Sequence, residues 1–534
     1  MKEQPVQRQS FLHGAAILAL ATALIKLIGA CYKLPLGNII GDAGYGYFTQ
    51  AYDIYSVLLT ISTAGLPVAM SRMISEAQAL GNHAQIRRVY KASLYVFLTI
   101  GVAGSGGMLL LCRQLAHFME QDNAWPAIAA LSPAVLFVCV VSSFRGFFQG
   151  QSNMTPTSVS QVIEALCKLL IGLGAAWIVM DQTGDVALAA GGAILGVTVG
   201  TVVSAAYLGA KHRAASAYLT GQGGEAKPLG LTIRQLLAIA IPITVGAAGL
   251  QLINLVDTKI VLAQLKGAVG FSQAQTDNLK GIYNFCQTLF NLPAAFIVPI
   301  TVSIIPSITN FLTMKNGRGA WQIEESAVRI TALLGLPCGI GLAVLSRPIL
   351  VMLRHYGEAQ LATGVPILTI LGVAVIFNCL VLLTNAIMQA HGNVTTPLIH
   401  MLLGGIVKVV VNYALVGIPS LNIIGAPIGT LSCYIAIITL NLIAMRRMLG
   451  TRCPRILRTL AKPLLASLVM GAAAWAAAGL LGRFVPSGAV CCLGAIALAG
   501  VVYCVMVLAL RIITLEDCML LPKGEKIARF LKIH

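Results

Sequence analysis

The chain alternates between long apolar runs and short polar loops along its whole length. A helix needs about 20 apolar residues to cross a bilayer, so runs of this length are typical of transmembrane helices. The pattern predicts an all-α polytopic membrane protein with about 14 transmembrane helices. The predicted spans are 11–37, 45–71, 92–112, 125–148, 156–180, 187–209, 233–263, 281–310, 327–350, 364–389, 396–417, 423–445, 463–481 and 488–510.

The composition supports this class. Hydrophobic residues make up 57% of the 534 residues and charged residues only 10%, which is too few charges to cover the surface of a soluble protein of this size. The formal net charge is +18, but the basic residues lie mostly in short loops between apolar runs. This distribution is typical of membrane topology and does not indicate nucleic-acid binding.

The loop charges also predict an orientation. An even number of spans puts both termini on one side, and most of the 36 lysines and arginines lie in loops on that side. Loops with an excess of lysine and arginine stay in the cytoplasm, so we expect both termini to be cytoplasmic. The opposite loops hold only Arg113, Lys266, Lys280, Arg347, Arg354 and Arg483.

Two segments of the chain repeat one another. "QGQSNMTPTSVSQVIEALCKLLIG" begins at Gln149, and "QAHGNVTTPLIHMLLGGIVKVVVN" begins at Gln389 with polar residues at matching positions. The match predicts two six-helix repeats in the same orientation plus two C-terminal helices, an architecture in which transporters place the substrate path between the halves. The predicted parts are an N-terminal lobe (1–210), a cytoplasmic linker (211–232), a C-terminal lobe (233–447) and a part with two extra helices and a basic cytoplasmic tail (448–534).

Charged residues interrupt several of the predicted spans. Each costs about 2.5–3.5 kcal/mol at the centre of a membrane helix, so such residues are expected to face a wet interior and to serve function. Because the cations outnumber the anions, the pattern favours an anionic ligand. The cations are Lys26, Lys33, Lys168, Lys259 and Lys408, and the anions are Asp53, Glu164 and Asp257.

Spacing within the helices gives expectations for individual charges. Lys26 and Lys33 are seven residues apart and share one helical face, although Lys33 could instead reach toward the outer headgroups. Glu164 and Lys168 have the spacing of a helical ion pair, which would be either structural or functional. Asp257 and Lys259 point in different directions and cannot pair with one another. Asp53 could form an ion pair with Lys26 or Lys33. The three carboxylates are also candidate sites for a coupling Na⁺ or H⁺.

The N-terminal block carries a family resemblance. "FLHGAAILALATALIKLIGACYKLPLGNIIGDAGYGYFTQAYDIY" and the turn "GLPVAMSRMISEA" resemble the polysaccharide-biosynthesis flippases of Gram-positive bacteria, the stage V sporulation protein B and YtgP group. These belong to the superfamily (MOP) that also contains the MurJ lipid II flippases and the MATE drug exporters. The resemblance implies alternating access between two lobes and a cationic cavity for the pyrophosphate of an undecaprenyl-linked precursor.

What the resemblance implies for function is a flippase in the bacterial plasma membrane. Its substrate would be an undecaprenyl-linked glycolipid, with lipid II as the first choice, and its partners would be membrane lipids and the cell-wall synthesis machinery. Lipid II flippases with arginine-rich cavities keep arginines in their first two spans, whereas this chain has Lys26, Lys33 and Asp53 there. The chain therefore departs from that pattern in the two spans that would contact the headgroup.

Three other interpretations of the function fit the sequence. A flippase for a teichoic acid, capsule or exopolysaccharide unit would look the same, a MATE-type drug/cation antiporter should show an acidic cavity, and a membrane scaffold would not need charges inside its spans. We find no nucleotide-binding loop, catalytic constellation or metal-ligand spacing in the sequence, so we expect a transporter, not an enzyme, without cofactor or metal. Pro67, Pro242, Pro293 and Pro299 are candidate hinges, with static kinks as the alternative.

Overall fold

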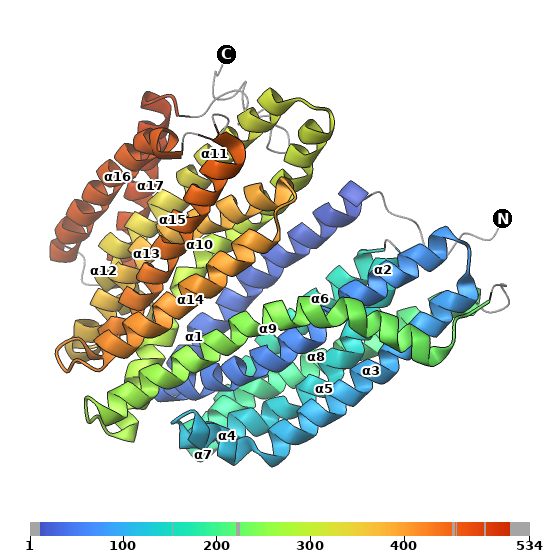
Figure 1. The fold of residues 1–534 in the computed structure, drawn as a ribbon. Coiled ribbons are helices and arrows are strands. Elements are labelled where there is room, and N and C mark those ends of the chain that lie inside the picture. The colour runs from blue at the N-terminus through green and yellow to red at the C-terminus, as the bar shows by residue number, and fades with distance from the viewer. Residues whose placement is uncertain are drawn as a thin grey trace. The chain divides into compact units, whose positions relative to one another are not determined.

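The described part of the chain consists mainly of long helices (Figure 1). Its structure, a computed structural model, describes residues 11–151, 153–219, 225–450, 454, 456–484 and 488–512. These residues fall into two compact units. The first ends at Lys266 and takes in Gly270–Asn284, and the second comprises Gly267–Val269 and begins again at Phe285.

The first unit contains the helices of the N-terminal half, joined by short turns. Its long α1 is broken at Gly41, whose backbone angles (φ 67°, ψ −174°) suit only glycine. The helices are α1 (Phe11–Thr63), α2 (Leu66–Ala79), α3 (His83–Leu110), α4 (Cys112–Phe118), the short η1 (Asp122–Ala124), α5 (Trp125–Gly150), α6 (Thr155–Cys167), the π-helical η2 (Lys168–Gly172), α7 (Leu173–Thr183), α8 (Val186–Leu219) and α9 (Leu229–Gly267).

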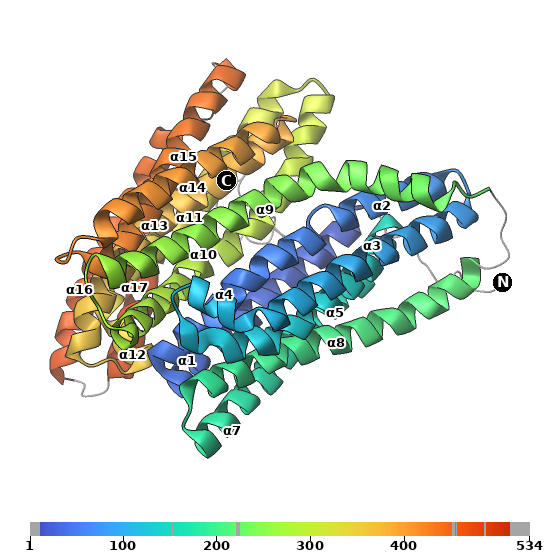
Figure 2. The same cartoon turned by 60° about the horizontal axis from the view of Figure 1, so that its bottom comes forward.

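The second unit is also helical in its described residues. Within it α14 and α15 run side by side, as do α16 and α17 (Figure 2). Its helices are α10 (Gln273–Thr313), which begins in the first unit, then α11 (Gly317–Val344), α12 (Ser346–Arg354), α13 (Glu358–Ala390), α14 (Thr395–Val416), the short η3 (Asn422–Ile424), α15 (Gly425–Leu449), α16 (Ile456–Phe484) and α17 (Gly488–Ala509).

The helices confirm the predicted fold class. Twelve runs among the described residues are long and apolar enough to cross a membrane. One of them, Leu24–Ala79, holds two predicted spans because the break at Gly41 divides it. The 41-residue α10, which is not among the twelve, covers the predicted span 281–310. A multi-pass membrane protein with about 14 spans accounts for this arrangement.

The two halves also repeat one another in local geometry. Helix α5 ends at Gly150 and α13 at Ala390, while α6 begins at Thr155 and α14 at Thr395. Both turns are closed alike: the backbone N–H of Asn153 donates to the carbonyl of Phe148, and that of Asn393 donates to the carbonyl of Met388, each at 3.0 Å. The sequence match therefore reflects one turn structure used twice.

The division into units differs from the predicted lobe boundary, because α9 groups with the first unit and not with the second. Gly65 explains how α9 comes so close. A Cβ at this glycine would lie 2.2 Å from the carbonyl oxygen of Ala240 in α9, so only glycine fits. Along the same helix, the hydroxyl of Thr258 donates to the carboxylate of Asp53 at 3.3 Å. Whether the functional lobes follow the predicted boundaries stays a prediction.

A stripe of glycines on α8 lets the neighbouring helices approach closely. Gly192, Gly196 and Gly200 are four residues apart and face α7, η2 and α6 in turn. A Cβ at Gly196 would lie 2.4 Å from the backbone nitrogen of Gly172. Small residues at such spacing allow backbone-to-backbone packing between membrane helices. The stripe therefore holds in place the π-helical turn that begins at Lys168.

We expect Gly196→Val to lower the thermal unfolding midpoint of the purified protein, because the added side chain must push η2 away from α8. The matched control is Gly174→Val, since Gly174 in α7 has open space where its Cβ would be. Thermal unfolding in detergent compares the two variants. Equal midpoints for both would show that the close approach of α8 is not needed for stability.

Candidate functional site

The first unit contains a cavity of about 550 Å³. By the orientation that the loop charges predict, it lies in the cytoplasmic half of the spans. Charged and aromatic side chains from four helices share its wall, which is unusual inside a membrane protein. We call it the first-unit cavity; its polar and aromatic lining includes Lys26, Tyr32, Tyr52, Tyr55, Ser142, Arg145, Gln149, Gln161, Glu164 and Lys168.

Lys168 lies on the faces of two tyrosine rings. Its ammonium nitrogen is 4.4 Å from the ring centroid of Tyr52 and 5.1 Å from that of Tyr32. The electron-rich face of an aromatic ring attracts a cation, so the tyrosines hold the charge without neutralising it. Tyr32 is itself fixed, because its hydroxyl donates to the carbonyl of Ala193 in α8 at 2.9 Å. Lys168 also opens a π-helical turn, a feature frequent at functional sites.

Glu164 pairs with Arg145 and not with Lys168. The guanidinium of Arg145 donates to the Glu164 carboxylate at 3.0 Å and to the hydroxyl of Ser160 at 3.1 Å. The predicted helical ion pair is replaced by other contacts: Arg145 reaches the Glu164 carboxylate from α5, and the ammonium of Lys168 lies against the rings of Tyr32 and Tyr52. Arg145 lies near the end of the predicted span 125–148 and was not among the cations expected to face the interior, so it is a cavity residue that the sequence pattern did not reveal.

The lysine pair of the first span divides between two places. Lys26 lines the first-unit cavity. Lys33 is half-buried and is not part of the cavity lining, but its charge acts on Lys168 and is attracted by Asp53. The structure thus brings three of the predicted cations, together with Asp53 and Glu164, into one electrostatic neighbourhood.

The remaining predicted charges lie elsewhere. The ammonium of Lys259 is 3.4 Å from the ring centroid of Phe118 in α4, and neither residue lines the first-unit cavity. Asp257 is buried in α9 with 4% of its surface exposed. Lys408 lies half-buried on α14 in the second unit.

The predicted hinge prolines occupy two kinds of position. Pro67 stands at the first turn of α2, where a missing N–H costs nothing, and it lines the first-unit cavity. Pro242 lies inside α9, and Pro293 lies buried inside α10. The side-chain surroundings of Pro299, also in α10, lie outside the described residues. That these helices bend during transport stays a prediction.

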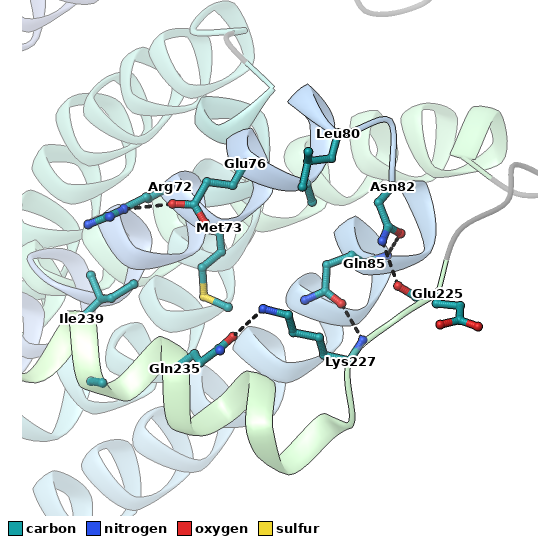
Figure 3. A pocket seen from close by; sticks show the side chains of 12 residues that line it. Arg72, Met73, Glu76, Leu80, Asn82, Gln85, Glu225, Lys227, Gln235 and Ile239 are labelled. Atoms are coloured by element: carbon teal, nitrogen blue, oxygen red, sulfur yellow. Dashed lines mark hydrogen bonds and ion pairs between the residues drawn. The ribbon is translucent and has the colours of Figure 1, made fainter.

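A second pocket, of about 460 Å³, lies between α2, the start of α3, the residues that lead into α9 and the first turns of α9 (Figure 3). Here Asn82 donates to the carbonyl of Glu225, and Gln85 accepts from the backbone N–H of Lys227, both at 2.8 Å (Figure 3). Its two basic side chains are balanced by two acidic ones. Unlike the first-unit cavity, this pocket carries no surplus of positive charge.

Comparison with known proteins decides the family. The family model for polysaccharide biosynthesis proteins matches residues 11–312, more than half of the chain. The chain belongs to the polysaccharide biosynthesis protein family. The chain is 27% identical to the uncharacterized membrane protein YabM of Bacillus subtilis, over 99% of this chain and 98% of that protein. It is 26% identical to the lipid II flippase MurJ of the same organism, over 89% of each chain.

Solved structures share the fold of this family member. A lipid II flippase MurJ in an inward closed conformation aligns with a TM-score of 0.65, covering 93% of this chain and 97% of that one at 14% identity. An inward-facing MATE multidrug transporter aligns with a TM-score of 0.63, covering 82% and 98% at 15% identity. Identities this low establish the shared helical architecture alone.

Proposed function

We propose that this protein is a flippase that moves an undecaprenyl-pyrophosphate-linked cell-wall precursor from the inner to the outer leaflet by alternating access, with lipid II as its first substrate. The observation that carries the proposal is the surplus of positive charge in the first-unit cavity, where Lys26, Lys168 and Arg145 face one acid, Glu164. Membership of the polysaccharide biosynthesis family and the similarity to a MurJ lipid II flippase point to the same class of substrate.

The cavity chemistry suits a pyrophosphate joined to a sugar. Lysine ammoniums bind phosphate as point charges, and an arginine can offer two parallel donors. Tyr52 adds a hydroxyl that is buried without a hydrogen-bond partner among the described residues. A buried polar group of this kind is stabilised when a ligand supplies its partner. Gln149 and Gln161 provide amides of the kind that recognise sugar hydroxyls.

The driving force we propose is the membrane potential, with Na⁺ or H⁺ as a possible coupling ion at a carboxylate of the spans. Moving one elementary charge across 100 mV corresponds to about 2.3 kcal/mol. A multiply charged anionic headgroup moving outward would therefore gain free energy from a potential that is negative inside. The protein would act as a transporter in the plasma membrane and would not transform its substrate.

The sign of the cavity charge separates this proposal from a drug/cation antiporter. A cationic drug would need a surplus of carboxylates at the binding site, whereas the first-unit cavity has a surplus of cations. A flippase for a teichoic acid, capsule or exopolysaccharide unit stays within the proposal, because those lipids can carry the same pyrophosphate. The family similarity at 26–27% identity does not choose among these headgroups.

Complementation tests the proposal. A bacterium depleted of its own lipid II flippase is given this protein, and lipid II is measured at the outer face of its membrane. We expect the wild type and Lys91→Ala to restore exposure, because Lys91 is exposed on α3 and does not line the cavity. Lys26→Ala at equal expression should restore much less. A wild type that is inserted but restores nothing would rule out lipid II as substrate.

A further inference from the structure

One face of the first turns of α10 is polar and lies in the first unit. Gln273, Asp277, Gly281 and Asn284 follow one another at spacings of three or four residues, so they share a helical face. Phe285 already belongs to the second unit. Gln273 and Asp277 precede the predicted span 281–310, so by the predicted orientation they lie at the extracellular ends of the helices.

The centre of this face is a fully buried carboxylate. Asp277 has 0% of its surface exposed. Its Oδ2 accepts a hydrogen bond from the hydroxyl of Tyr47 in the second part of α1 at 2.8 Å. Its Oδ1 accepts from the side-chain amides of Gln121 at 3.0 Å and of Gln273 at 2.9 Å. Three segments that are far apart in sequence thus meet at one side chain.

Further contacts along the same face of α10 connect this helix to the rest of the first unit. Gln273 also donates to the carbonyl of Glu120 at 3.1 Å, and the Glu120 carboxylate pairs with Lys266 at 3.1 Å. Asn284 donates to the hydroxyl of Thr49. At Gly281 the backbones touch, since a Cβ there would lie 1.8 Å from the carbonyl oxygen of Asp42. The outer end of α10 is therefore fastened to the first unit over about three turns.

We propose that the buried carboxylate of Asp277 is a proton-responsive latch that fastens the outer end of α10 to the first unit. Helix α10 continues from Asn284 into the second unit. A displacement of the second unit would therefore act on this connection through α10. The proposal concerns conformational change and holds for any substrate that the protein moves.

The direction of the pH effect follows from burial. Burial raises the pKa of the Asp277 carboxyl above its ordinary value, although the hydrogen bonds from Gln121, Gln273 and Tyr47 and the charge of Lys266 act the other way. The titratable and charged groups around it are Asp42 and Tyr47 on α1, Glu120 before α5, Asp185 before α8, Lys266 on α9 and Lys280 on α10.

An opened latch would return the carboxyl to water and its pKa to the ordinary range. The latched state therefore binds the proton more tightly than the opened state does. By linkage, lowering the external pH toward the raised pKa stabilises the latch, and raising the pH weakens it. Each unit of difference in pKa between the two states changes the latch equilibrium by up to about tenfold.

Hydroxyl-radical footprinting of the full-length protein in lipid nanodiscs tests this proposal without any transport substrate. The readout is oxidation of Tyr47, which is buried in the latch with 6% of its surface exposed, relative to the exposed Met314. We expect wild-type Tyr47 to be oxidised several-fold more slowly at about pH 5 than at about pH 8. The exposed-acid control Asp181→Asn should keep this dependence.

Two variants identify the group that titrates. Asp277→Asn should abolish the pH dependence of Tyr47 oxidation, whatever its absolute rate. Gln121→Ala removes a donor that favours the charged carboxylate, so it should move the transition to higher pH. A wild type without pH dependence, or an Asp277→Asn protein that keeps it, would overturn the proposal. Because the assay contains no substrate, failure of the proposed transport function would leave its outcome unaffected.

Discussion

Replacing Lys168 by methionine is expected to reduce lipid flipping about 10–100-fold while the protein still folds and inserts. A hydrogen bond between charged groups contributes about 1.5–3 kcal/mol, and each 1.4 kcal/mol is about tenfold in affinity. Methionine keeps most of the length of the lysine side chain and removes the charge that lies over Tyr32 and Tyr52. The rate of lipid II flipping in vesicles measures the effect.

Two further variants test whether the effect comes from the positive charge at this position. Lys168→Arg keeps the positive charge and should retain part of the activity. Lys211→Ala removes an exposed lysine of α8 outside the cavity and should behave as the wild type. Full activity of Lys168→Met would show that the charge of Lys168 is not needed for transport, even if the protein proved to be a flippase.

The second large effect is expected at the ion pair between Arg145 and Glu164. Only 14% and 26% of these side chains are exposed, so Glu164→Leu would leave a guanidinium without its partner in a mostly apolar wall. Breaking a fully buried pair costs about 3–5 kcal/mol, and partial exposure reduces this to about 1–3 kcal/mol. The thermal unfolding midpoint in detergent should fall accordingly.

A double-mutant cycle separates pairing from other effects. Arg145→Met combined with Glu164→Leu removes both charges and should recover much of the stability that Glu164→Leu loses. The double variant should still flip poorly, because it lacks a cavity cation. The exposed pair Arg72–Glu76 (67% and 63%) supplies the control, and Glu76→Gln should change stability by less than about 0.5 kcal/mol. Additive effects in the cycle would mean that Arg145 and Glu164 do not stabilise one another.

The architecture could be predicted because the hydrophobic pattern of membrane helices is set by the thickness of the bilayer. Each predicted span finds its helix, and the boundary between the first two falls near the break at Gly41. The repeat could be recognised in the sequence for a similar reason. In each turn an asparagine side chain caps the following helix: Asn153 accepts from the backbone N–H of Thr155 at 3.3 Å, and Asn393 accepts from that of Thr396 at 3.2 Å.

The details of the site depend on contacts that sequence spacing does not encode. Helical spacing predicts that Lys168 meets Glu164, but Arg145 pairs with the Glu164 carboxylate and the lysine lies on the tyrosine rings. Arg145 lies at the end of an apolar run, where a cation is usually assigned to a loop. Asp277 accepts hydrogen bonds from Tyr47 and Gln121, each more than 150 residues away in the chain. Contacts between such distant residues leave no local pattern in the sequence.

Direct binding is the most decisive test of the central claim that the first-unit cavity recognises a lipid-linked pyrophosphate. Purified wild-type protein in detergent is titrated with lipid II and, separately, with undecaprenol, which has the same tail without phosphates or sugars. We predict that lipid II binds at least about tenfold more tightly, because only its phosphates meet Lys26, Lys168 and Arg145. Equal affinity for both lipids would contradict the account, since binding would then come from the tail alone.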